Sequence, residues 1–241
     1  MASPLEQFEV HVLHPLSVGG VNAAFTNASL YMAFAVVGVT LFLTLGMRKA
    51  AVVPGRWQSI SELLYEFISG MVRDNAGHDA RPYFPFVFTL FMFILFANMI
   101  GLVPGSFAVT SHVIVTFALA AVVFLGVTLI AIAKHGLKFF SYFLPPDTPL
   151  YMAPLLVPIE VISYLARPIT LSLRLFANMM AGHTMLHVFA GFVIALGVFG
   201  IAPMAVIVAL YVLELLVALL QAYVFAMLTC MYINDALHPG H

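Results

Sequence analysis

The feature that most constrains this chain is an apolar run from Leu150 to Asn234, interrupted only by scattered polar residues. A membrane-crossing helix needs about 20 mostly apolar residues, so this run is too long for one crossing. Three shorter runs upstream each have the length of one crossing. The whole chain is 63% hydrophobic and 8% charged, against about 25% charged in soluble domains. We therefore predict an integral membrane protein, and exclude a soluble enzyme, a nucleic-acid-binding protein and a disordered linker.

The apolar runs predict an all-α polytopic membrane protein with five membrane-spanning helices in one domain, residues 1–241. Gly197, Gly200 and Pro203 offer the clearest turn in the long run and divide it into two helices. The first of these would be about 70 Å long if unbroken, so it must tilt strongly, kink near Pro168 or Gly182, or divide. The predicted spans are residues 30–47, 83–103, 112–133, 150–199 and 203–234.

Residues 56–74 have a different pattern. Apolar residues recur there at helical spacing, while Gln58, Glu62, Glu66 and Arg73 occupy the other face. This pattern is typical of an amphipathic helix that lies in the membrane interface. A helix packed on another subunit is the alternative.

Basic residues are concentrated in two of the predicted loops. Five of the nine Lys and Arg residues lie between Arg48 and Arg81, and Lys134 and Lys138 lie in the loop two spans later. Because cytoplasmic loops carry an excess of Lys and Arg, we expect both loops in the cytoplasm. Residues 1–28 then form an outer N-terminal segment, and five crossings place the C-terminus in the cytoplasm.

The last two spans contain polar and ionisable residues that lipid disfavours. An Arg or Asp at a helix centre costs about 2.5–3.5 kcal/mol on insertion scales, so such residues are candidates for an ion path. Arg167 is followed by Pro168, and snorkelling to the interface explains it equally well, whereas Arg174 lies seven residues deeper. The polar set is Glu160, Arg167, Arg174, Asn178, His183, His187, Glu214 and Gln221.

Helical phase divides the polar residues of the first of these two spans. His183 and His187 form a pair four residues apart, roughly opposite a stripe of other polar residues, so we expect this helix to face two partners. The stripe consists of Glu160, Arg167, Arg174 and Asn178, spaced by 7, 7 and 4 residues.

On the last span, Glu214 and Gln221 lie seven residues apart and align with Tyr211 and Tyr232. If Glu214 lies near one of the two histidines, the carboxylate and the imidazole form a pair in low dielectric and titrate as one unit.

A metal or haem site is the competing use of the histidines. His183 and His187 have the spacing of two metal ligands on one helix face, but no third ligand is near in the sequence. Two histidines on one helix face also cannot bind opposite sides of a haem. We therefore expect no metal and no cofactor.

The sequence PITLSLRLFANMMAGH, residues 168–183, resembles subunit a of the F-type ATP synthase. The preceding PIEVISYLARP, the segment 214–233 and FANMIGLVPG at 96–105 resemble the same family, as does PLEQFE at 4–9. The resemblance thus covers nearly the whole chain, and the motif SLRLFANM is far more specific than a match in hydropathy.

The resemblance implies a function in the stator of a rotary motor. Family members carry protons through two offset half-channels, to and from carboxylates on a ring of c subunits. Nucleotide chemistry belongs to other subunits, so this chain is expected to be non-catalytic by itself. The expected partners are the c-ring, b-type peripheral stalk subunits, the F1 sector indirectly and the lipid bilayer, with no nucleic acid. The expected location is a bacterial inner membrane, and protons are the expected ion, with sodium as the open alternative.

The resemblance also implies roles for individual residues. The family's indispensable arginine corresponds to Arg174. Asn178 and Gln221 match polar positions lining the route, and Glu160 matches an acidic position on the cytoplasmic exit side. Further candidates are His187, Arg167 and Tyr232.

Three positions differ from many bacterial members. Those members have a glutamate at the position of His183 and a histidine at the position of Glu214. The acid and the imidazole are exchanged here, as in mitochondrial and related bacterial members. Gly101 stands where some members carry an aspartate, so a contribution from that position is not expected.

Three other classes compete with this interpretation. A secondary transporter also carries charges at mid-membrane, but it usually shows internal repeats and paired broken helices. A haem-bearing membrane anchor of a respiratory complex would show haem absorbance. A purely structural subunit would tolerate substitution of Arg174.

Overall fold

The structure, a computed structural model, describes residues 10–14, 17–18, 21–22, 24–48, 51, 53–103, 105–136 and 152–238. Half of the outer segment expected at 1–28, and residues 137–151 with Lys138, therefore lie outside the described residues. Five helices in the described part are long and apolar enough to cross a membrane, which confirms the all-α polytopic fold. They are α1 (Asn27–Met47), α3 (Phe84–Gly101), α4 (Val113–His135), α5 (Ala153–Leu196) and α6 (Ile201–Leu237).

Short strands precede the first span, and a local hydrogen-bond motif begins it. Two antiparallel pairs form, β1 (Val12–His14) with β4 (Phe25–Thr26), and β2 (Ser17–Val18) with β3 (Val21–Asn22). The backbone N–H of Thr26 then donates to Ser29 Oγ at 2.8 Å, and that of Ser29 donates to Thr26 Oγ1 at 3.4 Å. This reciprocal capping satisfies two backbone donors, so α1 begins three residues before its predicted start.

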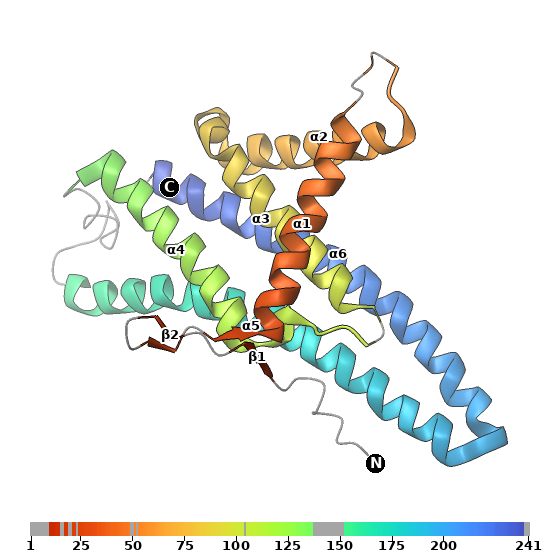
Figure 1. The fold of residues 1–241 in the computed structure, drawn as a ribbon. Helices are drawn as coiled ribbons and strands as arrows, with labels where there is room; N and C mark the ends of the chain where they lie inside the picture. Colours follow the sequence, from red (N-terminus) through yellow and green to blue (C-terminus); the bar gives the residue numbers. More distant parts are fainter. Residues whose placement is uncertain are drawn as a thin grey trace.

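The amphipathic helix α2 (Arg56–Ala76) lies across one end of α1 (Figure 1). Ile68, Met71 and Val72 from its second half are buried in the main hydrophobic core. Trp57 and Leu63, from the first half, remain 69% and 66% exposed. Part of the predicted apolar face therefore packs on the bundle, and the rest of it is exposed.

Helix α3 packs against α1, α2 and α6. The short helix η2 (His78–Tyr83) leads into it, and Pro85 occupies its first turn, where a missing N–H costs nothing. Half of the residues in its most apolar window are buried, a larger share than in any other described span.

The penultimate helix α5 is one continuous helix of 44 residues, about 66 Å long at 1.5 Å per residue. It contains Pro158 and Pro168, and it changes direction along its length (Figure 1). Gly197, with φ +55°, ends it in a backbone conformation that residues with a Cβ rarely adopt. The short helix η6 (Gly197–Gly200) then reverses the chain, and α6 runs back alongside α5. The predicted turn lies where the sequence indicated it.

Candidate functional site

The turn at Gly197–Gly200 determines which residues of α5 and α6 become neighbours. Both helices rise equally per residue, so positions equally distant from the turn lie at similar depth. His183 lies 14 residues before Gly197, and Glu214 lies 14 residues after Gly200. Three polar pairs, which we call the polar line, join the helices: His183–Glu214, Asn178–Gln221 and Arg167–Asp235.

The first pair is an imidazole and a carboxylate inside the bundle. His183 Nε2 lies 3.7 Å from Glu214 Oε1, and the two side chains are only 10% and 5% exposed. Neither carboxylate oxygen of Glu214 accepts a hydrogen bond from the described residues. His187 is exposed instead, and its Nδ1–H donates to the His183 carbonyl at 3.0 Å. The structure thus brings Glu214 to the first of the two histidines.

Gly182 provides the space that Glu214 occupies. A Cβ at this position would lie 2.5 Å from Glu214 Oε1 and 2.9 Å from its Cδ. Only a residue without a side chain therefore lets the carboxylate lie against α5. In the sequence, Gly182 marks only a place where the helix can kink, and nothing there indicates this close approach.

The second pair is made by two amides. Asn178 Nδ2 donates to Gln221 Oε1 at 2.9 Å. Gln221 is 3% exposed, and its own Nε2 has no hydrogen-bond partner in the described part of the chain. This buried amide donor is therefore a site for water or another polar group.

Members of both the polar stripe and the histidine pair contact α6: Arg167 and Asn178 from the stripe, and His183 from the pair. Leu175 and Met179 are fully buried and, with Gly182, form the strip of α5 that α6 covers. At about 100° per residue, Asn178 and His183 flank this strip on opposite sides, about 140° apart. A single helix packed over the strip therefore contacts both edges.

Arg174 lies at the middle of α5 and is exposed. It belongs to the Asn178 side of the buried strip, one helical turn before that residue. No carboxylate in the described ranges lies within ion-pair distance of its guanidinium. The middle of this membrane-spanning helix thus carries an exposed charge.

The third pair lies toward the other end of the polar line. Arg167 donates to Asp235 Oδ2 at 3.0 Å, and its guanidinium lies 5.4 Å from the Tyr164 ring and 5.1 Å from the Tyr232 ring. These are cation–π distances. Glu160, two turns earlier on α5, is half-buried.

Asp235 is the member of the polar line that sequence reasoning missed. The predicted last span ended at 234, whereas α6 continues to Leu237 and includes it. The available signal was its spacing, since it lies 14 residues after Gln221 and therefore near the same face.

Helix α3 and the residue that follows it make polar contacts with α6 in addition to the polar line. Asn98, fully buried, donates to the Ala218 carbonyl at 3.3 Å and accepts from Thr110 Oγ1 at 2.9 Å. The hydroxyl of Tyr211 donates to the Leu102 carbonyl. These contacts fix α6, and with it Glu214 and Gln221, against the core.

In the described ranges, no three His, Cys, Asp or Glu side chains gather as a metal site would require.

The sequence profile of the ATP synthase A chain family matches residues 29–234. The chain belongs to this family. The match covers α3, α4 and α5 completely and α1 and α6 except for a few terminal residues, and it includes every residue of the polar line except Asp235.

Relatives named ATP synthase subunit a support the same family over the full length. The protein of Parvibaculum lavamentivorans is 61% identical over 245 residues, covering 99% of this chain and 94% of the relative. That of Paramagnetospirillum magneticum is 53% identical, covering 99% of each chain. That of Afipia carboxidovorans is 54% identical, covering 100% of each.

Membership of the ATP synthase A chain family confirms the resemblance found in the sequence. The chain is a multi-pass membrane component of the ATP synthase complex, in its CF(0) sector, and serves ATP synthesis and proton transport. The secondary transporter and the haem-bearing anchor are set aside on this ground.

Proposed function

We propose that this chain is the non-catalytic stator subunit that carries protons through two offset half-channels, to and from carboxylates on a ring of c subunits. The observation that carries the proposal is the exposed guanidinium of Arg174 at the middle of a membrane-spanning helix. A cation facing lipid there would cost about 2.5–3.5 kcal/mol. An anionic partner that passes the guanidinium removes that cost, and a carboxylate of the ring is such a partner.

Arg174 acts as a block between the two half-channels. A proton that crosses 100 mV releases about 2.3 kcal/mol, so a proton path that bypasses the ring would dissipate this free energy. The guanidinium stays charged at working pH and repels a proton moving directly between the channels. It also favours the ionised form of the ring carboxylate next to it, which makes that carboxylate release its proton.

The outer half-channel is built from the first two pairs of the polar line. Glu214 and His183 relay protons inward, and Asn178 with Gln221 continues the route toward Arg174. The buried Glu214 oxygens and Gln221 Nε2 have no hydrogen-bond partner among the described residues. Such groups recruit ordered water, and a chain of water and titratable groups conducts protons.

The inner half-channel lies toward Glu160, Arg167 and Tyr232. Glu160 is a half-buried acidic group on the same stripe as Arg174, suited to accept a released proton. The Arg167–Asp235 pair and the Tyr232 ring hold this end of α5 against α6. His187, which is exposed, is a second group that protons entering from outside can reach.

The remaining expectations concern orientation and partners. The described Arg48, Arg56, Arg73, Arg81 and Lys134 lie at the same side of the bundle by the order of the spans. This supports a bacterial inner-membrane protein with its N-terminus outside and its C-terminus in the cytoplasm. The b-type stalk subunits bind the same chain from the cytoplasmic side and connect it to the F1 sector.

The test is ATP-driven acidification of sealed vesicles that carry the assembled complex, in buffer without sodium. We expect normal proton uptake by the wild type and uptake at least about tenfold slower in Glu214→Gln, because an amide cannot take up the proton. Glu66→Gln, on the exposed face of α2, is the matched control and keeps the normal rate. No uptake until sodium is added would make sodium the ion, and a normal rate in Glu214→Gln would remove that residue from the path.

A further inference from the structure

A second group of polar side chains lies away from the polar line, where α2 meets α3. The chain turns at Gly77, and η2 folds back beside the last turns of α2. This corner encloses a hollow of about 490 Å³. We call it the α2–α3 hollow; the lining residues that matter are Tyr65, Ser69, Arg73, His78, Arg81 and Phe84.

The α2–α3 hollow is positively charged. Arg73 from α2 and Arg81 from η2 both line it, and none of its lining residues is acidic. Asp74 lies 3.7 Å from Arg73 Nε, but the two side chains are 71% and 66% exposed, so water screens their attraction. The Oδ2 atom of Asp79 lies 3.4 Å from His238 Nε2. Two guanidinium groups are thus left for an anion.

The hollow also has an apolar and aromatic side. Helix α3 begins at Phe84, so this wall is the start of a membrane span. The Tyr65 ring packs edge-on against Phe84, with 4.8 Å between the ring centroids. Tyr is enriched at the level of lipid headgroups. The hollow therefore combines cationic side chains with an apolar wall at the depth where a lipid changes from headgroup to acyl chain.

We propose that the α2–α3 hollow binds the phosphate of an anionic phospholipid. Arg73 and Arg81 hold the phosphate oxygens, for which the guanidinium fork is well shaped, and the Ser69 hydroxyl is placed to donate a further hydrogen bond. The glycerol and upper acyl chain lie against Phe84. The inference rests on the proposed orientation, because the cytoplasmic leaflet is the one that presents anionic lipid to basic pockets.

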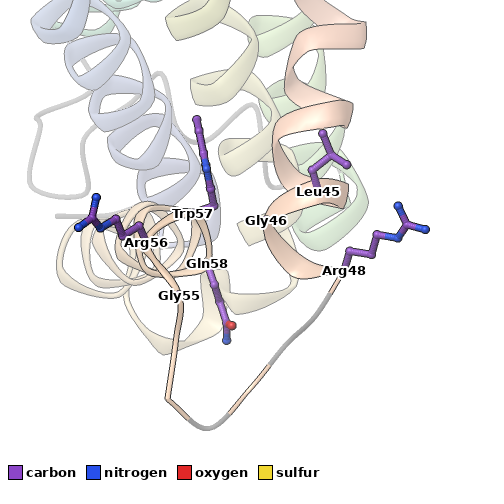
Figure 2. Close-up of a pocket in the computed structure, with 7 residues that line it drawn as sticks. All are labelled: Leu45, Gly46, Arg48, Gly55, Arg56, Trp57 and Gln58. Atoms are coloured by element: carbon purple, nitrogen blue, oxygen red, sulfur yellow. The ribbon is translucent and has the colours of Figure 1, made fainter.

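A second basic hollow, also on the proposed cytoplasmic side, is less suited to bind a phosphate. It lies at the beginning of α2 and is lined by Arg48, Arg56, Trp57 and Gln58. Figure 2 shows the Arg48 and Arg56 side chains pointing away from each other. Guanidinium groups so arranged do not converge on one phosphate, which makes Arg56 a matched control.

The experiment uses the assembled complex in lipid nanodiscs of phosphatidylcholine with a trace of photoactivatable phosphatidylglycerol. After illumination, labelling of the segment 57–85 is measured by mass spectrometry. We expect labelling to fall about fivefold for each arginine lost in Arg73→Gln and Arg81→Gln, and to stay unchanged in Arg56→Gln. Unlabelled phosphatidylglycerol should compete, and phosphatidylcholine should not.

Each remaining outcome overturns the proposal. Equal labelling in the wild type and the two variants would show that the arginines do not select the lipid. Full competition by inorganic phosphate would identify free phosphate as the ligand. If either glutamine variant fails to assemble, Arg81→Lys keeps the charge but loses the fork, and unchanged labelling there would contradict a forked contact. The readout involves no proton movement, so it is independent of the proposed half-channels.

Discussion

At the scale of single residues, the site depends on Gly182, which has no side chain. Gly182 leaves the space in which the Glu214 carboxylate lies, 2.5 Å from where a Cβ would stand. The neighbouring His183 then comes within 3.7 Å of that carboxylate. Composition and spacing select Glu214 and His183 as candidates, but they do not reveal a steric requirement between two helices.

We therefore predict that Gly182→Ala displaces the Glu214 carboxylate and leaves α5 in place, because the end of a flexible side chain moves more easily than a packed helix. Misplacement of a proton-carrying group by about 1 Å costs up to about a hundredfold in rate. Assembly should survive while ATP-driven acidification falls by tenfold or more.

Gly191→Ala is the control for this change, since nothing lies within 4 Å of the Cβ it would add. It should pump at the normal rate. Equal rates in the two alanine variants would show that Gly182 is not needed to position Glu214.

At the scale of elements, the α5–α6 hairpin explains what could be predicted. The Gly-rich turn and the residue numbers alone predict that His183 and Glu214 are neighbours, 14 residues on either side of it. Further along the hairpin, the two partners of a pair no longer lie equally far from the turn. Arg167 and Asp235 pair although they lie 30 and 35 residues from the turn. Counting residues from the turn therefore fails toward that end of the hairpin. Asp235 was missed for the further reason that the helix end was predicted one residue before it.

The Arg167–Asp235 pair gives a prediction at this scale. Its side chains are 24% and 42% exposed, so the ion pair is partly desolvated. Arg167→Ala and Asp235→Ala should each lower the temperature at which the complex loses pumping. The double variant should lose less than the two single effects together, because each single change removes the same interaction.

Heat inactivation of ATP-driven pumping measures this double-mutant cycle. Strict additivity of the two single effects would mean that the contact does not stabilise the hairpin. Lys134→Ala, at the end of α4, provides the comparison for loss of a charge outside the pair.

At the scale of the whole molecule, the distribution of charge predicts the orientation. Most of the basic residues lie in or next to α2, or at the end of α4 and just after it, and the apolar spans carry few charges. Hydropathy is thus enough to predict five spans and an interfacial helix. It does not predict that α2 divides its apolar face between the core and the surroundings, since that depends on how α2 packs on the bundle.

Cysteine labelling tests the orientation. A membrane-impermeant maleimide should react with Val12→Cys from the outside of intact cells, because Val12 is 57% exposed in the N-terminal segment. Glu66→Cys, exposed on α2, should react only in inverted vesicles. The native Cys230 is fully buried and should react in neither. Labelling of Glu66→Cys from outside would reverse the proposed topology.

The decisive measurement is ATP-driven proton pumping by assembled complexes that carry Arg174→Ala. The exposed guanidinium at the middle of α5 has no ion-pair partner in the described ranges, and we attribute to it both the block between half-channels and the release of protons from the ring. Its removal should abolish ATP-driven acidification and coupled ATP synthesis, although the complex assembles. Normal pumping by Arg174→Ala complexes would contradict this function for the chain.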